Sequence, residues 1–394
     1  MVDVRKKVEE ITPEITQMRV HIHENPELSM KEYNTCALLE DYVKKNVKYD
    51  RLKRVGETGL FFELKGTKPG NGPTIVFRGD IDALPIQEDE HMSPRSKVPG
   101  VMHACGHDVH GTINVGAAKI LSEMKDQFSG SIYFFIQPAE EILQGAKLFL
   151  NDPEIDFDKI DAVAALHVSA ELDAGTIGVR YGAILASADG IRIRINGKGG
   201  HGATPEVCVD AITAGAAVVQ SLQTIVSRFT SPMDSVVVTV GSFHAGTRCN
   251  IIAQDAVLEG TLRAFDDNVH ARLIEHFKRI ITDVSAAYGC TAEIEINEVA
   301  GVVVNDEALC RIANECAAEL VPPDRIQPQH PCMLGDDFAS YRAIAPSCFV
   351  QVGMLAPEKN CCYAHHHGMF KVDEDVLPLC AAWMAAMAAR AAAR

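Results

Sequence analysis

Residues 74–85 read Thr74-Ile75-Val76-Phe77-Arg78-Gly79-Asp80-Ile81-Asp82-Ala83-Leu84-Pro85, a short β-rich run followed by an acidic loop. A polar loop at the carboxyl end of a strand is where α/β sheets place their ligands. The pattern recurs downstream, where a predicted strand over 131–136 precedes Glu140 and Glu141 and one over 162–166 delivers His167. We therefore predict an α/β domain in which these polar side chains meet at one edge of a sheet.

The segment richest in chemistry lies between these strands and reads Met102-His103-Ala104-Cys105-Gly106-His107-Asp108-Val109-His110-Gly111. Thiolate and imidazole groups bind Zn-like divalent ions well. Cys105 and His107 are two positions apart, so an extended backbone would aim both at one point, and Gly106 lets the chain come close to it. Because buried imidazoles and acids need partners, a metal site explains this cluster better than a packed core does.

Two further groups of polar side chains extend the candidate site. Glu140 and Glu141, at the head of a predicted helix, point to different sides, so one can bind a metal while the other stays free as a general base. An acidic pair also opens helices for electrostatic reasons alone, and a histidine after a strand, such as His167, is as often a core residue as a ligand. The run His365-His366-His367 is typical of metal or proton chemistry. Beside Cys105 and His107, the metal interpretation is favoured throughout.

The bulk composition limits the classes of partner. The formal net charge is −16, which argues against nucleic acid or an anionic membrane surface. The 12 cysteines are scattered and do not form the closely spaced framework of a small secreted domain. The N-terminus is charged without an apolar core, and no apolar run suits a membrane span, so we predict a cytoplasmic protein with no membrane partner.

The chain has 394 residues, more than one hydrophobic core usually serves, so two domains are expected. In its middle the predicted elements follow the order βαββαβ, the ferredoxin-like unit, with strands over 191–195, 235–243, 256–264 and 291–298 and helices over 206–228 and 269–288. We predict a discontinuous catalytic domain over 1–185 and 300–394, and an inserted domain over 186–299.

The predicted inserted domain carries three candidate substrate contacts. Its glycine-rich turn, Gly197-Lys198-Gly199-Gly200-His201-Gly202, lacks the spacing of a phosphate-binding loop and is better suited to presenting His201 to a substrate. Arg263 closes a predicted strand, where it could bind a carboxylate in a bidentate fork or, equally, form a surface ion pair. Asn250 precedes that strand.

Taken together, the motifs resemble those of the M20 metallopeptidases, in particular the amidohydrolase branch with hippurate hydrolase, N-acetyl-amino-acid and N-acetyldiaminopimelate deacetylases and auxin-conjugate hydrolases. The resemblance covers nearly the whole chain. It rests on these motifs: His21-x-His23-x-x-Pro26-Glu27, Asp80-Ile81-Asp82-Ala83-Leu84-Pro85, Met102-His103-Ala104-Cys105-Gly106-His107-Asp108, Gln137-Pro138-Ala139-Glu140-Glu141, Leu166-His167, Gly197 to Ala203, Gly260-Thr261-Leu262-Arg263 and Asp337-Phe338.

The resemblance implies a metal-dependent amidohydrolase with two divalent ions per subunit (Mn, Zn, Ni or Co). It implies Glu140 as general base and proton shuttle, and Asp82 as the acid that orients a metal-binding histidine. The metal ligands that it implies are Cys105, His107, Glu141, His167 and one C-terminal histidine.

The resemblance also implies how the substrate is held. The inserted domain would serve as a dimerisation and lid domain, in a homodimer or higher homo-oligomer. His201 of one subunit would reach the active site of its partner and steady the oxyanion. Asn250 and Arg263 would help hold the substrate, an N-acyl amino acid or a related small amide or dipeptide.

Two motifs depart from the family pattern. The family's His-x-Pro-x-Phe becomes His366-His367-Gly368-Met369-Phe370, and the retained spacing makes His366 the expected ligand, with His365 and His367 as alternatives. The family's Glu-Asp-Phe becomes Asp336-Asp337-Phe338, in a loop expected to border the pocket.

Two other functions are compatible with the same residues. One is a hydrolase with Cys105 as nucleophile and a nearby histidine as base, which would work without metal. The other is a metal-stabilised binding protein without catalytic activity, although such proteins commonly lack a ligand or the general base.

Overall fold

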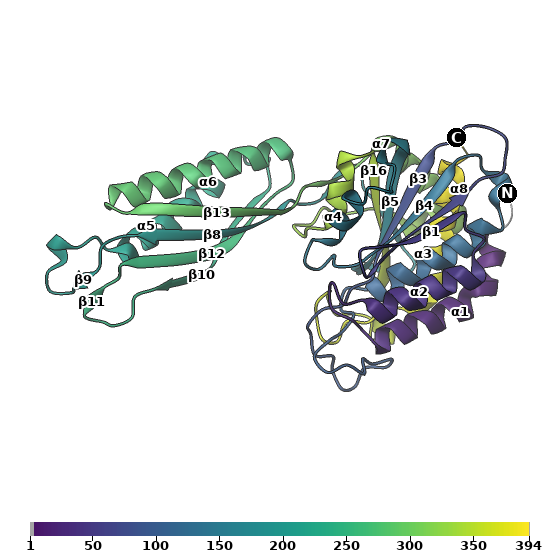
Figure 1. The fold of residues 1–394 in the computed structure, drawn as a ribbon, viewed down its shortest axis with the longest axis horizontal. Helices are drawn as coiled ribbons and strands as arrows, with labels where there is room; N and C mark the ends of the chain where they lie inside the picture. Colours follow the sequence, from purple (N-terminus) through teal and green to yellow (C-terminus); the bar gives the residue numbers. More distant parts are fainter. Residues whose placement is uncertain (1–3, 394) are drawn as a thin grey trace. The chain divides into compact units, whose positions relative to one another are not determined.

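The computed structural model describes residues 4–393, apart from the side chains of residues 298 and 299. The chain forms two compact units (Figure 1). Unit 1 comprises Met1–Gly182, Val304–His330 and Asp336–Arg394, and unit 2 comprises Ala183–Val303 and Pro331–Gly335. Strands β7 (Gly182–Leu185) and β14 (Val303–Asn305), which pair with each other, contain the points where the chain enters and leaves the larger part of unit 2.

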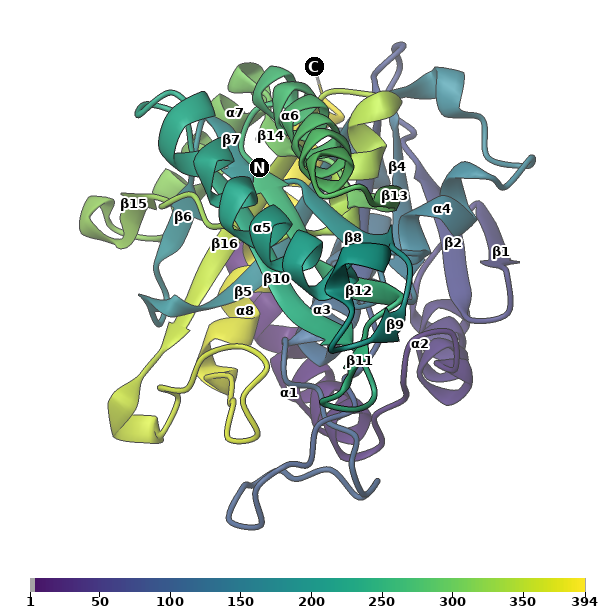
Figure 2. The ribbon, with the colours of Figure 1, turned by 90° about the vertical axis from the view of Figure 1, so that its left-hand side faces the viewer.

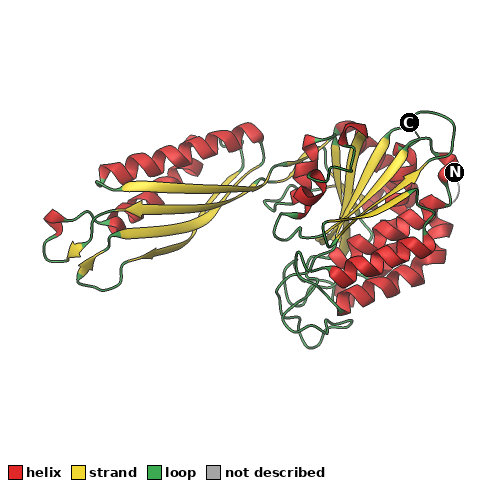
Figure 3. Ribbon diagram, viewed as in Figure 1, coloured by secondary structure: helices red, strands yellow, loops and turns green. Residues whose placement is uncertain are grey.

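Unit 1 is built on an eight-stranded mixed sheet with helices on both faces (Figure 3). Across the sheet its strands are β1 (Arg51–Val55), β2 (Gly59–Lys65), β4 (Ser131–Gln137), β3 (Thr74–Asp80), β5 (Ile160–Asp173), β16 (Ser347–Leu355), β6 (Ile177–Val179) and β15 (Ile326–Pro328). The central strands β4, β3, β5 and β16 run parallel to their neighbours in that group, and β3, β4 and β16 are buried along almost their whole length. Parallel strands covered on both faces are apolar on both faces, which explains their continuous apolar runs.

Six helices flank this sheet among the residues that the structure describes. They are α1 (Val4–Glu24), α2 (Tyr33–Asn46), α3 (His107–Ser122), α4 (Gly145–Leu150), α7 (Glu307–Leu320) and α8 (Leu377–Ala391). Helix α3 packs between the sheet and the pair α1 and α8, and it is buried over nearly its whole length. The α/β class predicted from the sequence is confirmed. Within 4–393, no helix has both the length and the apolar character needed to cross a membrane.

Unit 2 has the element order β8 (Ala188–Asn196), α5 (Ala211–Thr224), β10 (Val236–Ala245), β12 (Asp255–Ala264), α6 (Asp267–Ala287) and β13 (Thr291–Ala300). Its antiparallel sheet has the order β10-β12-β8-β13, as in a ferredoxin-like unit. Helices α5 and α6 lie side by side on one face of this sheet (Figure 2). A short two-stranded excursion, β9 (Gly200–His201) with β11 (Ile251–Ile252), projects from one end.

Two predictions about local structure were wrong, and one strand was missed. Glu140 and Glu141 do not open a helix, because they lie in a turn and α4 begins only at Gly145. Ala139 and Leu143 have φ of 56° and 55°, and left-handed residues cannot continue into a right-handed helix. The helix predicted over 206–228 starts at Ala211, where the Asp210 side chain accepts the first free N–H groups, and ends in a π-helical turn, Ile225–Phe229. Strand β1 was not predicted at all.

Candidate metal centre

Cys105 and His107 approach the site through a tight turn, and not through the extended backbone predicted for them. Gly106 caps α3 in the left-handed region, with φ of 89°. A Cβ at this position would lie 2.2 Å from Cγ2 of Val168 on β5. Glycine is therefore required for two reasons, the backbone conformation and the close approach of α3 to β5.

The structure brings the five predicted metal ligands together. The Cys105 Sγ lies 3.7 Å from Nε2 of His167, which lies in the middle of β5 and not, as predicted, directly after the end of a strand. Nε2 of His107 lies 3.8 Å from Glu141 Oε1, and the other oxygen of Glu141 lies 3.5 Å from His366 Nε2. The potential ligand atoms form two triads that share Cys105, one with His107 and His167 and one with Glu141 and His366; within each triad they lie within 4.8 Å of one another. A shared cysteine between two triads is an arrangement suited to two ions.

The histidine run resolves into three different environments. The His366 ring faces Glu141, and its backbone has φ of 64° and donates to the Ala104 carbonyl at 2.8 Å. His365 Nε2 accepts the Ala170 N–H at 3.2 Å, and its ring meets that of His167 edge to face, with centroids 5.5 Å apart. The exposed His367 ring stacks on Tyr363, with ring centroids 4.8 Å apart. Only His366 of the three joins a triad.

The chemistry of these side chains fits divalent cations. Nε2 of His107 and Oε1 of Glu141 are buried and have no hydrogen-bond partner among the described residues. Burial, with the nearby Glu141 carboxylate, raises the pKa of the Cys105 thiol to about 12. Burial, with the carboxylates of Asp336 and Glu141, also raises the pKa of Glu140 well above its usual range. Cations held between these groups would relieve both effects and would favour the thiolate.

Asp82 forms hydrogen bonds with two members of this cluster, His107 and Glu141. Its Oδ1 lies 3.1 Å from Nδ1 of His107, and its Oδ2 accepts the Ser29 hydroxyl at 2.6 Å and the Glu141 N–H at 3.0 Å. Burial opposes ionisation of Asp82, but its hydrogen bond and attraction to His107 lower its pKa below the usual value. A carboxylate that accepts the Nδ1–H of His107 leaves the Nε2 lone pair of that ring facing the site.

Glu140 lies in the same turn as Glu141. It is buried, and its Oε2 lies 4.0 Å from His107 Nε2. Its carboxylate also lies in a group with Asp336 and Asp337, whose ligand atoms are all within 4.8 Å of one another. Glu140, the predicted general base, therefore lies next to the predicted ligands. It forms a further metal-capable group with His107 and Glu141 but belongs to neither of the two triads that share Cys105.

A buried arginine, for which no role was predicted from the sequence, organises the acids around Glu140. Arg78 on β3 donates to Asp336 at 2.9 Å and to Asp337 at 2.8 Å, and it also pairs with Asp80. Its Nε donates to Gln137 at 3.1 Å. An arginine inside an apolar β-run, followed by an aspartate two residues later, is the signal that could have identified it.

The three substrate contacts predicted for the second domain lie in unit 2. His201 is exposed on β9, where it pairs with Ile251, and the following Gly202 N–H donates to the Asn250 carbonyl at 2.9 Å. His201 and Asn250 thus share one end of the unit. Arg263 is next to last in β12 and donates to the Met333 carbonyl at 2.8 Å. It lies roughly 25 Å along the strand from the β9 end.

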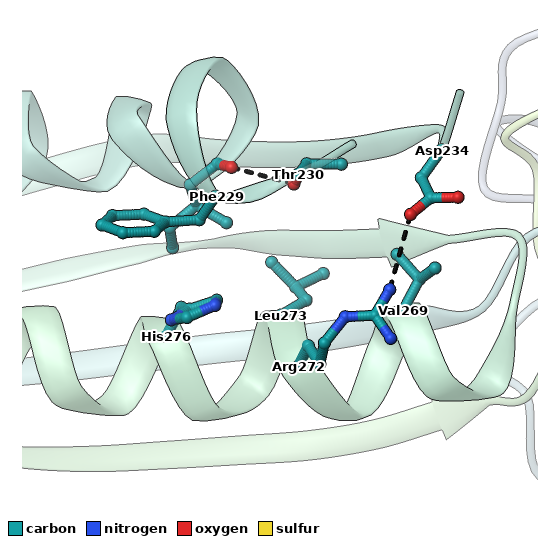
Figure 4. Close-up of a pocket in the computed structure, with 8 residues that line it drawn as sticks. Phe229, Thr230, Asp234, Val269, Arg272, Leu273 and His276 are labelled. Carbon is teal, nitrogen blue, oxygen red and sulfur yellow. Dashed lines mark hydrogen bonds and ion pairs between the residues drawn. The ribbon is translucent and has the colours of Figure 1, made fainter. Parts of the chain in front are cut away.

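A small pocket in unit 2 lies between the π-helical turn and α6 (Figure 4). Arg272 faces Asp234 across its edge at 3.4 Å, and Phe229 stacks on His276 with centroids 4.8 Å apart. Within the described residues, all five groups of metal-capable side chains lie in unit 1. The pocket is therefore not a second metal centre.

Residues 76–390 of this chain match the sequence pattern of peptidase family M20/M25/M40. The chain belongs to this family. As an M20 member it is a metal-dependent hydrolase that acts on amide bonds. The family assignment thus confirms the resemblance that the motifs carry.

The similarity to M20 relatives extends over nearly the whole chain. The N-acetylcysteine deacetylase of Bacillus subtilis is 35% identical over 95% of this chain and 96% of its own length. Thermostable carboxypeptidase 2 of Saccharolobus solfataricus is also 35% identical, over 95% of each chain. A solved structure from Bacillus subtilis, described as a dinuclear metal-binding M20 peptidase, has a TM-score of 0.84 at 32% identity and covers 97% of this chain and 98% of its own.

Proposed function

We propose that this M20 enzyme hydrolyses N-acyl amino acids to a carboxylic acid and a free amino acid. The observation that carries the proposal is the pair of ligand triads that share Cys105, with Glu140 buried beside them. The similarity to an N-acetylcysteine deacetylase supports an N-acyl amino acid as substrate, whereas the equal similarity to a carboxypeptidase makes a short peptide the second candidate.

The two triads would hold two divalent ions, chosen among Mn, Zn, Ni and Co by availability. When bound, such ions lower the pKa of water toward neutrality and polarise an amide carbonyl. The protein holds its ligands in the required state, since Asp82 keeps a proton on the Nδ1 of His107 and so frees the Nε2.

Glu140 acts as the general base and proton shuttle in this proposal. Its carboxylate takes a proton from the attacking water and returns it to the amine that leaves. Burial excludes bulk water from this carboxylate, and the neighbouring acids make it receptive to a proton. Arg78 fixes Asp336 and Asp337 beside it, and these two acids contribute to the raised pKa of Glu140.

We further propose that the active site is completed by a second copy of the chain. His201 and Asn250 lie at one end of unit 2 and Arg263 near the other, so one copy cannot bring all three to one small substrate. In the proposed dimer, His201 and Asn250 of one subunit would steady the oxyanion and the substrate in the other, and Arg263 would bind the substrate carboxylate.

The edge strands of unit 2 favour such a dimer. Strand β10 forms one edge of the sheet, is ten residues long and contains no aspartate, glutamate, lysine or arginine. Strand β13 at the opposite edge exposes Glu293 and Glu295. Charged side chains protect an edge against pairing, whereas a long uncharged edge invites it, so β10 is the edge suited to pair with a second copy.

The activity is tested by release of free amino acid from a panel of N-acetyl, N-benzoyl and longer N-acyl amino acids and dipeptides, with Mn or Zn loaded and after chelation. Metal-dependent release is expected. Activity that survives complete metal removal would instead favour Cys105 as nucleophile, and bound metal without turnover on any substrate would favour a binding protein. Glu140→Gln should keep its metal and lose most turnover, whereas the control Glu171→Gln, at an exposed site, should behave as wild type.

The shared active site is tested by mixing two inactive variants, His201→Ala and Glu140→Gln, after dissociation and reassembly. A hybrid dimer contains one site with an intact Glu140 and a His201 supplied by its partner, so activity should return. If His201 served its own subunit, no hybrid would contain an intact site and the mixture would stay inactive.

A further inference from the structure

His110 lies one helical turn beyond His107 on α3 and is fully enclosed, with 1% of its surface exposed. Strand β3 pairs with β5 only as far as Arg78 opposite Ala165. Beyond that point, the N–H and the carbonyl of Val168 on β5 form hydrogen bonds with histidine side chains. The Val168 N–H donates to His110 Nε2 at 3.0 Å, and the Val168 carbonyl accepts from His167 Nδ1 at 2.6 Å.

These two contacts fix the tautomers of both histidines. A backbone N–H can only donate, so His110 Nε2 carries a lone pair and its proton sits on Nδ1, where it is donated to Asp80. A carbonyl can only accept, so the proton of His167 sits on Nδ1 and its Nε2 lone pair faces Cys105. The backbone of Val168 thus sets the tautomers of both His110 and His167.

We propose that His110 is a positioning residue for the metal ligand His167. This inference rests on the proposed function, because it takes His167 as a ligand. His110 does not ligate, since both of its ring nitrogens are engaged, one by Asp80 and one by Val168. It holds the Val168 backbone in place, and that backbone holds the proton of His167.

Two further contacts make the arrangement rigid. The rings of His110 and His167 meet edge to face, with centroids 4.4 Å apart, which limits rotation of the ligand ring. Asp80 is itself held by Arg78, so the chain of contacts runs from a buried ion pair to the ligand. Removal of a residue that orients a metal ligand in this way commonly lowers metal affinity by about 10- to 100-fold.

The test measures metal affinity, and not turnover, in three variants. His110→Leu removes both hydrogen bonds, His110→Asn can keep a donor toward Asp80 but does not reach Val168, and His110→Gln can supply a donor and an acceptor. Affinity for Mn and Zn is measured by competition with a chelator, and the visible spectrum of the Co-loaded protein reports the ligand geometry. Thr112→Val is the control, because it removes a buried hydrogen bond of the same helix without touching Val168.

The Leu and Asn variants should lose about 10- to 100-fold in affinity for one of the two ions and show an altered Co spectrum, with partial recovery in the Gln variant. The Thr112→Val control should match wild type. Wild-type affinity and spectrum in a folded Leu or Asn variant would overturn the inference, and the Asn variant decides the matter if the Leu variant fails to fold. Failure of the wild-type protein to bind two ions would instead refute the proposed metal centre.

Discussion

The substitution Gly106→Ala tests directly how tightly the residues around the metal centre are packed. Gly106 stands between two proposed ligands, with φ of 89°, and an added Cβ would meet Val168 Cγ2 at 2.2 Å. Carbon atoms pack best at roughly 3.5–4.0 Å, so the two segments must separate by more than about 1 Å. That movement would carry Cys105 and His107 away from His167.

Two terms give the size of the effect on stability. A left-handed conformation costs an L-residue about 1–2 kcal/mol relative to its preferred regions. Forcing extra volume into a packed interior adds about 1–3 kcal/mol. The free energy of unfolding should therefore fall by about 2–5 kcal/mol, and a ligand shift of about 1 Å should lower kcat/KM by roughly 100-fold.

Gly100→Ala is the matched control, since Gly100 has φ of 75° and a Cβ there would meet nothing within 4 Å. This variant bears the backbone term alone and should lose about 1–2 kcal/mol. Urea unfolding of both variants and of wild type gives the difference. The reasoning is refuted if the two variants lose equal stability. It is also refuted if Val168→Ala, which removes the clashing methyl groups, fails to recover part of the loss in the double variant.

Three further outcomes follow from the buried charges and the ligand set. Arg78→Met leaves the carboxylates of Asp80, Asp336 and Asp337 buried without a cation, so denaturant unfolding should show a loss of about 3–5 kcal/mol, and an unchanged midpoint would contradict the role of this arginine. Burial raises the pKa of Glu32 from 4.5 to about 7, so its contribution to stability is full below pH 4.5 and is lost as the pH rises through 7; Glu32→Gln should flatten that part of the stability curve. Adding Mn or Zn to the metal-free protein at 100 times its Kd should raise the free energy of unfolding by about 2.7 kcal/mol for each site that fills, and calorimetry that shows no shift would argue against a metal centre in the folded chain.

Much of the fold was predictable because its signals are local. The apolar runs of β3, β4 and β16 and the apolar face of α6 arise from residues close in sequence, so their periodicity predicts strands and a helix without knowledge of the chain path. Strand β1 was missed because its sequence, Arg51–Val55, carries three basic residues and is stabilised by pairing with β2.

The turn that carries Glu140 and Glu141 shows where local patterns fail. Its left-handed Ala139 is held by a distant residue, since the Ala139 N–H donates to the buried Glu32 carboxylate at 2.8 Å. A contact across more than a hundred residues cannot be read from the acidic pair itself, whose local preference is for the start of a helix.

The sequence by itself determined the α/β class, the residue types of a metal site and the motifs of the M20 family, because each is written in short stretches of neighbouring residues. Only the tertiary structure decided which members of those stretches face one another. It set His366, and neither of its two neighbours, opposite Glu141, placed Arg78 among Asp80, Asp336 and Asp337, and set His110 against the backbone beside His167. These choices depend on hydrogen bonds and burial between segments far apart in the chain, and such contacts exist only once the sheet and its helices have packed.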